Sequence, residues 1–330
     1  MNGKRIVVTG AAGFVGMYVV NTLVNKGYHV VAGVHRLSAG SVFPRSEDIT
    51  IVELDILDRN SVIAAMEGAD AVYHFAALVD SGSSKDMLSR VNVEGTKIVW
   101  ECAVACGVKK ALYCSSTAVY GLLAKSDGAI TEEILPRAIE SYGRTKLEGE
   151  QVALDLSARY GLHTTIIRPV AIFGPGEHTP FGKKLRDAAL SKLLIAGAFK
   201  KKKFNYVQVE DVAAAAVYLV EKYLPSGEIF NITVNTPILY DEAFTAYIRV
   251  LSRLGRPFIK VKIMALCSLY LHKFPVMLKW ISRLFGESFL FTIWRSGFDY
   301  NYSSTKLLNT SFVFKYTEFE EVFYSCVETK

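Results

Sequence analysis

The stretch Thr9-Gly10-Ala11-Ala12-Gly13-Phe14-Val15-Gly16 decides the fold of this chain, because it places three glycines between a strand-like run and a helix-like run. The run Arg5-Ile6-Val7-Val8 in front of it, with three consecutive β-branched apolar residues, predicts a strand. A Gly-x-x-Gly-x-x-Gly loop at such a junction is typical of a site for the pyrophosphate of a dinucleotide. Gly10 would allow the tight turn, Gly13 a close approach of the backbone to the phosphates, and Gly16 close packing of the helix on the sheet.

The helix that follows the loop is predicted over residues 14 to 25. Its first residues, Phe14 and Val15, would offer unpaired N–H groups and the positive end of the helix dipole to the anion. A glycine pattern alone is a weak signal, since glycine loops also serve as plain turns. Its place at the first strand–helix junction is what favours the dinucleotide site.

A second pattern is independent of the first. Tyr142 and Lys146 are four residues apart, so on a helix they share one face. The strand predicted over residues 110 to 115 leads into the hydroxyl group of Ser116. These three side chains can catalyse hydride transfer at a carbinol carbon: the tyrosine is the acid or base, the lysine lowers its pKa, and the serine holds the substrate oxygen. A Tyr-x-x-x-Lys pair alone indicates only an amphipathic helix, and the glycine loop upstream gives it chemical meaning.

Short apolar runs alternate with helical patterns over the first 170 residues. Strands are predicted over residues 4–9, 29–34, 50–53, 71–75, 110–115 and 164–168, and helices over 14–25, 59–66, 84–106 and 142–160. This alternation predicts an α/β fold, a Rossmann-type doubly wound parallel sheet with right-handed crossovers. We expect a dinucleotide-binding domain over 1–170 with a return segment at about 205–235, and a smaller, mainly helical substrate lobe from 171–204 and 236–330.

Together these pieces resemble the extended short-chain dehydrogenase/reductase family, which forms the NAD(P)-dependent epimerase/dehydratase superfamily. The matching motifs follow the order of the family along most of the chain: the glycine loop, Asp55-Ile56, Tyr73-His74-Phe75-Ala76-Ala77, Asn92-Val93-Glu94-Gly95-Thr96, Ser115-Ser116, Tyr142 with Lys146, and Arg168-Pro169 leading to Phe173-Gly174-Pro175-Gly176. The resemblance implies a Rossmann domain, NAD or NADP chemistry and a C-terminal substrate domain. It says far less about the substrate.

The resemblance also implies roles for single residues. Ser116 stands where the family places its catalytic Ser or Thr, with Thr117 as the competitor, and Asn92 where the family often has an asparagine that interrupts a helix and supports the lysine through water. A plain polar helix residue is the alternative for Asn92. Implied cofactor contacts are Gly10, Gly13, Phe14, Val15 and Gly16 at the phosphates, Asp55 and Ile56 at the adenine, Ala76 and Ala77 under the cofactor, Tyr142 and Lys146 at the nicotinamide ribose, and Pro169. Asp55 has an alternative role as a helix N-cap.

The end of the second strand bears on the choice between NAD and NADP. An acidic residue there would bind the ribose 2′-hydroxyl and select NAD. This chain has Val34-His35-Arg36-Leu37 and no acid at that place. Because a guanidinium group suits a 2′-phosphate, His35 and Arg36 predict NADP, with NAD as the alternative. The plainer interpretation makes Arg36 a solvated loop residue.

The net charge of +6 arises in one C-terminal segment, since residues 253–295 hold eight of the 38 basic and one of the 32 acidic residues. Within it, 21 of the 32 residues from Ile263 to Trp294 are apolar. None of its apolar runs reaches the roughly 18 to 20 residues of a membrane span. Such a segment fits a packed lobe, an apolar substrate lid, a dimer face or a contact with a membrane surface.

Other features mainly exclude functions. The run Lys200-Lys201-Lys202-Lys203 is typical of a solvated turn, with contact to an acidic substrate as the alternative. No nucleic-acid motif is present, and the five cysteines show no metal-ligand spacing, so neither nucleic acid nor metal is expected. The odd cysteine count and a first strand at the N-terminus favour a cytoplasmic protein, with peripheral membrane contact through 263–294 as an option. We also expect a homodimer.

Two branches of the family compete for the substrate. A dehydratase would carry an Asp-Glu pair after the catalytic serine, where this chain has Thr117 and Ala118. The late segment 298–308 and the ending Phe319-Glu320-Glu321 resemble the branch of 3β-hydroxysteroid dehydrogenases and long-chain keto-acid reductases. We therefore favour an NADP(H)-dependent oxidoreductase that interconverts a secondary alcohol and a ketone on an apolar, steroid-like or keto-acid-like substrate. The alternatives are a nucleotide-sugar epimerase or reductase, and a non-catalytic NADP-binding regulatory protein.

Overall fold

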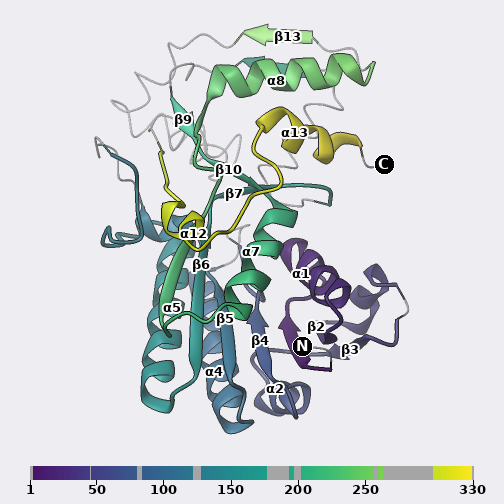
Figure 1. The fold of residues 1–330 in the computed structure, drawn as a ribbon, viewed down its shortest axis with the longest axis vertical. Helices are drawn as coiled ribbons and strands as arrows, with labels where there is room; N and C mark the ends of the chain where they lie inside the picture. Colours follow the sequence, from purple (N-terminus) through teal and green to yellow (C-terminus); the bar gives the residue numbers. More distant parts are fainter. Residues whose placement is uncertain are drawn as a thin grey trace.

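A parallel sheet forms the centre of the computed structural model, which describes residues 3–44, 46–79, 84–121, 128–176, 193–196, 202–255, 259–262 and 300–328. The seven strands lie in the order β11-β6-β5-β4-β1-β2-β3 (Figure 1). They are β1 (Arg5–Thr9), β2 (His29–Val34), β3 (Ile49–Glu53), β4 (Ala71–His74), β5 (Lys110–Cys114), β6 (His163–Pro169) and β11 (Glu228–Ile232). The order reverses between β1 and β4, and ligands of open parallel sheets bind at such a reversal, beyond the carboxyl ends of the strands. The predicted fold class is confirmed.

Helices cover both faces of this sheet, which is why its strands are apolar on both sides. On one face, α1 (Phe14–Asn25) and α7 (Val209–Glu221) pack together and share one apolar core (Figure 1). On the other face, α2 (Arg59–Met66), α4 (Gly95–Ala105) and α5 (Ser141–Tyr160) bury a second core around Trp100. None of the described helices is long and apolar enough to cross a membrane.

The predicted bounds of α1, β2 and α2 agree with the structure, and the other strands of the first 170 residues differ by one or two residues at their ends. The single helix expected over 84–106 is instead α3 (Lys85–Ser89), a π-helical turn η2 (Arg90–Glu94) and α4. The wider turn places Asn92 inside the core rather than on the periodic helix face. Apolar periodicity does not detect such a turn, because one extra residue in the backbone hydrogen-bond ring changes the register only locally.

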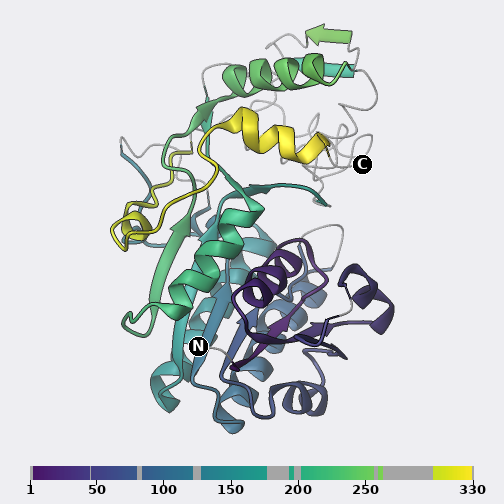
Figure 2. The same ribbon diagram turned by 45° about the vertical axis from the view of Figure 1, so that its right-hand side comes forward.

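Smaller strand pairs and two helices lie beyond one end of the sheet (Figure 2). Here β7 (Ala171–Phe173) pairs with β10 (Tyr206–Gln208), β9 (Lys203–Phe204) with β12 (Ile238–Leu239), and β8 (Leu193–Ala196) with β13 (Ile259–Lys262). The helices α8 (Tyr240–Arg253) and α13 (Phe319–Glu328) pack through Tyr247 and Phe323, whose ring centroids are 4.5 Å apart. The expectation of a mainly helical lobe from 171–204 and 236–330 misses β12 and β13, because their partner strands come from distant parts of the sequence.

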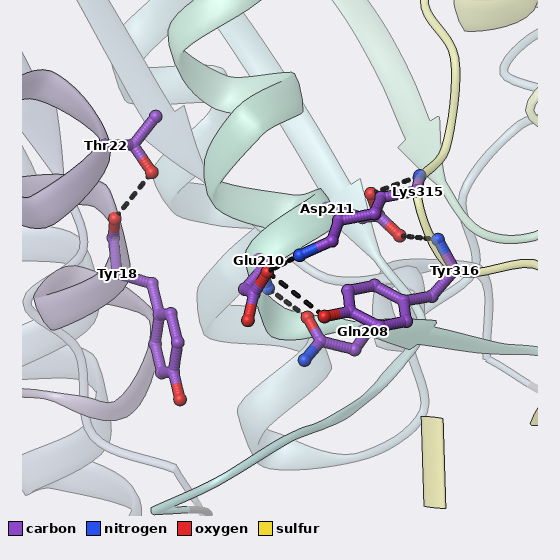
Figure 3. A network of polar contacts seen from close by, with 7 residues as sticks. All are labelled: Tyr18, Thr22, Gln208, Glu210, Asp211, Lys315 and Tyr316. Atoms are coloured by element: carbon purple, nitrogen blue, oxygen red, sulfur yellow. Dashed lines mark hydrogen bonds and ion pairs between the residues drawn. The ribbon is translucent and has the colours of Figure 1, made fainter. Parts of the chain in front are cut away.

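The C-terminal segment is fixed to the start of α7 by polar contacts (Figure 3). The Asp211 carboxylate accepts hydrogen bonds from the backbone N–H groups of Lys315 and Tyr316 at 2.8 and 3.0 Å. The Lys315 ammonium lies 2.8 Å from the Glu210 carboxylate, to which the Tyr316 hydroxyl also donates at 3.3 Å. Because Asp211 is buried, these bonds satisfy an otherwise costly charge and hold the end of the chain in place.

Candidate active site

The glycine loop forms a tight passage between β1 and α1. Gly10 has φ of +66°, and a Cβ atom added to it would lie 2.6 Å from the backbone nitrogen of Ala76. A Cβ on Gly16 would lie 2.2 Å from the carbonyl oxygen of Gly10. The N-cap of α1 is Gly13, and no side chain caps the helix there. The first turn, with Phe14 and Val15, therefore presents backbone N–H groups that suit the phosphates of a dinucleotide.

Two hydroxyl candidates follow β5, and they face different partners. Ser116 is the N-cap of the short helix η3 (Thr117–Tyr120), where its Oγ accepts a hydrogen bond from the Ala118 N–H at 3.2 Å. Its side chain also interacts with the hydroxyl of Tyr142, and this contact lowers the pKa of that tyrosine. Thr117 is buried, and its hydroxyl donates to the carbonyl oxygen of Pro169 at 3.3 Å. The structure thus brings Ser116, rather than Thr117, to Tyr142.

Tyr142 and Lys146 lie on successive turns of α5, as their spacing indicates. Burial and the nearby Cys114 thiol raise the pKa of Tyr142 despite the opposing effect of Ser116, so the phenol is protonated in the free protein. Lys146 is 2% exposed, and burial lowers the pKa of its ammonium group to about 8. Its Nζ lies 4.2 Å from the centroid of the Tyr113 ring. A buried cation without an ion pair among the described residues, beside a phenol, is the arrangement that acid–base chemistry uses.

Asn92 projects from the π-helical turn and bonds the end of β4 to α5. Its amide oxygen accepts from the Leu78 N–H at 2.8 Å, and its nitrogen donates to the Leu78 carbonyl at 2.9 Å and to the Thr145 Oγ1 at 3.0 Å. The resemblance implies support of Lys146 through water, whereas these direct bonds run to its neighbour Thr145. The Thr145 hydroxyl in turn donates to the carbonyl oxygen of Tyr142 at 2.9 Å.

The residues predicted for the adenosine end lie at the carboxyl ends of β2 and β3. His35 and Arg36 are exposed, and Ile56 is buried against Gly95. The alternative role of Asp55 as a helix N-cap is wrong, because Asp58 caps α2 by accepting from the Asn60 N–H at 3.0 Å. Asp55 instead accepts from the Leu57 N–H at 2.9 Å within its own turn. Its carboxylate is partly exposed at the edge of the sheet.

Further sequence-based expectations concern metal ligands, cysteines, the lysine run and the apolar C-terminal segment. Among the described residues, no group of His, Cys, Asp or Glu side chains is arranged to hold a metal ion. Among the four described cysteines, Cys102 is buried, while Cys106, Cys114 and Cys326 are partly exposed. Of the lysine run, Lys202 and Lys203 are described, and Lys203 begins β9. The apolar segment 263–294, and the lid, membrane and dimer roles considered for it, lie outside the described residues.

Sequence reasoning missed the buried residues that connect these groups, namely Thr9, His74, Thr96, Tyr113 and Thr145. His74 lies within a motif that matches the family, and that was the only signal available for it. Its partners are 65 and 22 positions away in the sequence, so no local pattern could indicate the contacts.

Comparison with known proteins places this geometry in context. A family model described as the NAD dependent epimerase/dehydratase family matches residues 6–233. The 3beta-hydroxysteroid-dehydrogenase/decarboxylase isoform 2 of Arabidopsis thaliana is 32% identical over 284 residues, which cover 77% of this chain and 49% of that protein. UDP-glucose 4-epimerase of Bacillus subtilis is 30% identical over 279 residues, which cover 74% of this chain and 81% of that protein.

Solved structures share the whole fold at lower sequence identity. UDP-N-acetylglucosamine 4-epimerase from Methanobrevibacter ruminantium, in complex with UDP-N-acetylmuramic acid, has a TM-score of 0.79 at 20% identity, with 99% of this chain and 98% of that one covered. At this identity the likeness concerns the fold alone. The chain spans between about half and two thirds of the length of the first curated relatives that it matches.

Proposed function

The chain belongs to the NAD dependent epimerase/dehydratase family, and from that premise we propose that it is an NADP(H)-dependent oxidoreductase of secondary alcohols and ketones. The observation that carries the proposal is the contact between the Ser116 and Tyr142 side chains, one helical turn from the buried ammonium group of Lys146. These groups lie at the carboxyl edge of the sheet, next to a glycine loop in which an added Cβ would collide with backbone atoms. The site therefore combines a dinucleotide cradle with an acid–base pair.

The roles of the three side chains follow from their chemistry. A bound nicotinamide cofactor would supply the hydride in reduction or accept it in oxidation. Tyr142 gives its proton to the ketone oxygen, and it holds that proton in the free protein because burial raises its pKa. Ser116 orients the same oxygen through its hydroxyl. Lys146 stabilises the phenolate left behind, since a nearby cation favours the charged form of the tyrosine.

We further infer NADP as the preferred cofactor and Arg36 as the residue that selects it. The Arg36 side chain is exposed at the end of β2, and it forms no ion pair with another described residue. A guanidinium in that position can bind a 2′-phosphate through two parallel hydrogen bonds. NAD is the alternative, and the family description names that cofactor.

An apolar substrate is supported by exposed apolar side chains that are close in sequence to residues of the site. Val79, which follows Leu78 at the Asn92 contact, is 48% exposed, and Ile139, three residues before Tyr142, is 46% exposed. Apolar walls with few polar groups are usual in pockets for small apolar ligands. The similarity to a hydroxysteroid dehydrogenase/decarboxylase points the same way. The second candidate, a nucleotide-sugar epimerase or reductase, is favoured by the similarity to UDP-glucose 4-epimerase, which extends over most of that protein.

The experiment is a turnover screen with the full chain. NADPH oxidation would be followed with 3-ketosteroids and β-keto acids, and UDP-sugar isomerisation would be followed with NAD present, with Tyr142→Phe as the matched inactive variant. Turnover of a steroid or keto acid that is lost in this variant supports the proposal. Turnover of UDP-sugars alone would replace it by the second candidate. Cofactor binding without turnover of any class would favour the regulatory protein.

A further inference from the structure

A chain of buried hydrogen bonds runs from the glycine loop to the catalytic helix and passes through His74, which has no role in the mechanism above. His74 is the last residue of β4 and is 1% exposed. Its Nδ1 lies 2.7 Å from the Oγ1 of Thr9, and its Nε2 lies 3.1 Å from the Oγ1 of Thr96. Both threonines have no exposed surface. The imidazole therefore bridges β1 and α4 in a part of the core from which water is excluded.

The positions of the protons in this chain can be assigned by counting. The Thr96 hydroxyl donates to the carbonyl oxygen of Asn92 at 2.7 Å, and it has no second proton to give. The Nε2 of His74 must therefore carry the hydrogen and donate to Thr96. A neutral imidazole then has a bare Nδ1, which accepts the proton of Thr9. Every bond thus points in one direction, from β1 toward Asn92.

The two ends of the chain are the two halves of the active site. At one end, the Ala76 N–H donates to Thr9 at 3.3 Å, directly beside Gly10. At the other end, Asn92 donates to Thr145, which donates to the carbonyl oxygen of Tyr142. The first end belongs to the cofactor cradle, and the second end holds the turn of α5 that carries the acid–base residue.

A second contact joins His74 to Lys146. The imidazole stacks on the ring of Tyr113 with centroids 5.9 Å apart and an interplanar angle of 28°. The Lys146 Nζ lies over the same ring, 4.2 Å from its centroid. Burial and, secondarily, the charge of Lys146 lower the pKa of His74 to about 3. The ring is consequently neutral at ordinary pH, which the proton count requires.

We propose that His74 is a positioning residue that fixes the cofactor loop relative to Tyr142 through its Nε2–H tautomer. The inference rests on the proposed role of Tyr142. Hydride and proton must reach adjacent atoms of the substrate, and the groups that deliver them are carried by different elements of the fold. Small displacements between such groups reduce the rate strongly. His74 acts through Thr9 and Thr96, and it does not touch the reacting atoms.

The test uses threonine-to-valine changes, which keep the shape of the side chain and remove only the hydroxyl. We expect Thr96→Val to lower kcat at saturating cofactor about tenfold, which corresponds to about 1.4 kcal/mol in the activation barrier. Thr96→Ser, which keeps the hydroxyl, restores most of that loss. The matched control is Thr165→Val on β6, a buried threonine whose Oγ1 has no hydrogen-bond partner among the described residues; this variant keeps the wild-type kcat.

A double variant separates a positioning chain from mere packing. If Thr9→Val and Thr96→Val break one connected chain, their combination costs about as much in kcat as the larger single loss, since parts of one unit are not additive. Losses that multiply in the double variant would overturn the proposal, as would a folded Thr96→Val protein with wild-type kcat. Failure of the proposed function looks different, because Tyr142→Phe itself would then remain active.

The tautomer is also measurable in the unaltered protein, which keeps the proposal testable if a variant does not fold. NMR of the full chain with isotope-labelled histidine reports which ring nitrogen carries the hydrogen. We expect a proton on Nε2 and none on Nδ1 of His74 from pH about 5 upward, given its lowered pKa. A proton on Nδ1, or on both nitrogens, would overturn the assignment.

Discussion

Two buried cations at the carboxyl end of the sheet, Lys146 and Arg168, are held in opposite ways. The Arg168 guanidinium donates to both oxygens of the Glu150 carboxylate, at 2.8 and 2.6 Å, and to the Tyr120 hydroxyl at 2.8 Å. Lys146 is equally buried, yet among the described carboxylates none lies within ion-pair distance, and its ammonium group lies over the Tyr113 ring. One cation is neutralised in place, and the other is left with its charge uncompensated.

The pKa directions express this difference. Burial lowers the pKa of Arg168, but the hydrogen bonds and charge of Glu150 outweigh it and leave that pKa raised. Burial lowers the pKa of Lys146 to about 8, and the charges of Cys114 and Glu150 offset it only in part. A satisfied buried charge stabilises one arrangement of the core, whereas an unsatisfied one titrates near neutral pH and is available for chemistry.

The largest expected effect concerns one tyrosine near each cation, namely Tyr142, one helical turn before Lys146, and Tyr120, whose hydroxyl accepts from Arg168. Tyr142→Phe should lower kcat by roughly 10² to 10⁴, because it removes the acid–base group, while the Kd of the cofactor stays nearly unchanged. Tyr120→Phe is the matched variant at Arg168 and should lower the unfolding free energy with little change in kcat. Steady-state kinetics and denaturant unfolding measure both. Near-normal turnover in Tyr142→Phe would end the catalytic assignment.

The next effect is on stability. Glu150→Gln leaves Arg168 buried without its counter-ion and should lower the unfolding free energy by about 3 to 5 kcal/mol. The control is Glu101→Gln, which breaks the exposed pair with Arg59 and should cost at most about 1 kcal/mol. Urea unfolding of both variants makes the comparison. Equal small losses would mean that the Arg168 pair is no more important to stability than a surface pair.

A third cation, Arg36, extends the comparison to the surface. Arg36→Ala should weaken NADP binding by about 1.5 to 3 kcal/mol, roughly 10- to 100-fold in Kd, because a charge-assisted bond to the 2′-phosphate is lost. NAD binding should be almost unchanged. Fluorescence titration of both cofactors measures the difference, with Lys26→Ala as a control for a distant exposed cation paired with Glu221. Equal losses for both cofactors would remove Arg36 from cofactor selection.

The smallest effect is the pH dependence set by Lys146. Below pH about 8 its ammonium is charged and supports Tyr142, and as pH rises through about 8 the charge is lost, so kcat/KM should fall. Arg168 should cause no fall in kcat/KM in this pH range, because its pKa is raised and it stays charged. In Lys146→Arg the charge persists to higher pH, so any residual activity should lack the fall near pH 8. A fall that remains in this variant belongs to another group.

Several features of the fold and of the candidate site could be predicted from local sequence patterns. Spacing alone predicts that Tyr142 and Lys146 share a helix face, and the helix bounds of α1 and α2 follow from apolar periodicity. The place of the glycine loop follows from the strand before it and the helix after it. These features could be predicted because each depends on residues within about two turns of one another.

Other features depend on contacts between distant residues. That Ser116 rather than Thr117 meets Tyr142 depends on the turn of η3, and that Asp58 rather than Asp55 caps α2 depends on which carboxylate reaches the Asn60 N–H. The strands β12 and β13 exist through partners elsewhere in the chain. Local propensity does not predict such pairings, because the contacts that stabilise them form only when distant parts of the chain come together.

The sequence by itself determined the strands and helices of the first 170 residues, the position of the glycine loop and the residue types of the acid–base pair. Only the tertiary structure decided which buried groups are paired. Glu150 pairs with Arg168, 18 positions away in the sequence, and Lys146 has no counter-ion among the described residues. His74 on β4 contacts Thr9 on β1 and Thr96 on α4. The physical reason is burial: charge and hydrogen-bonding groups acquire their pKa values and tautomers from whatever the fold places beside them, once water is excluded.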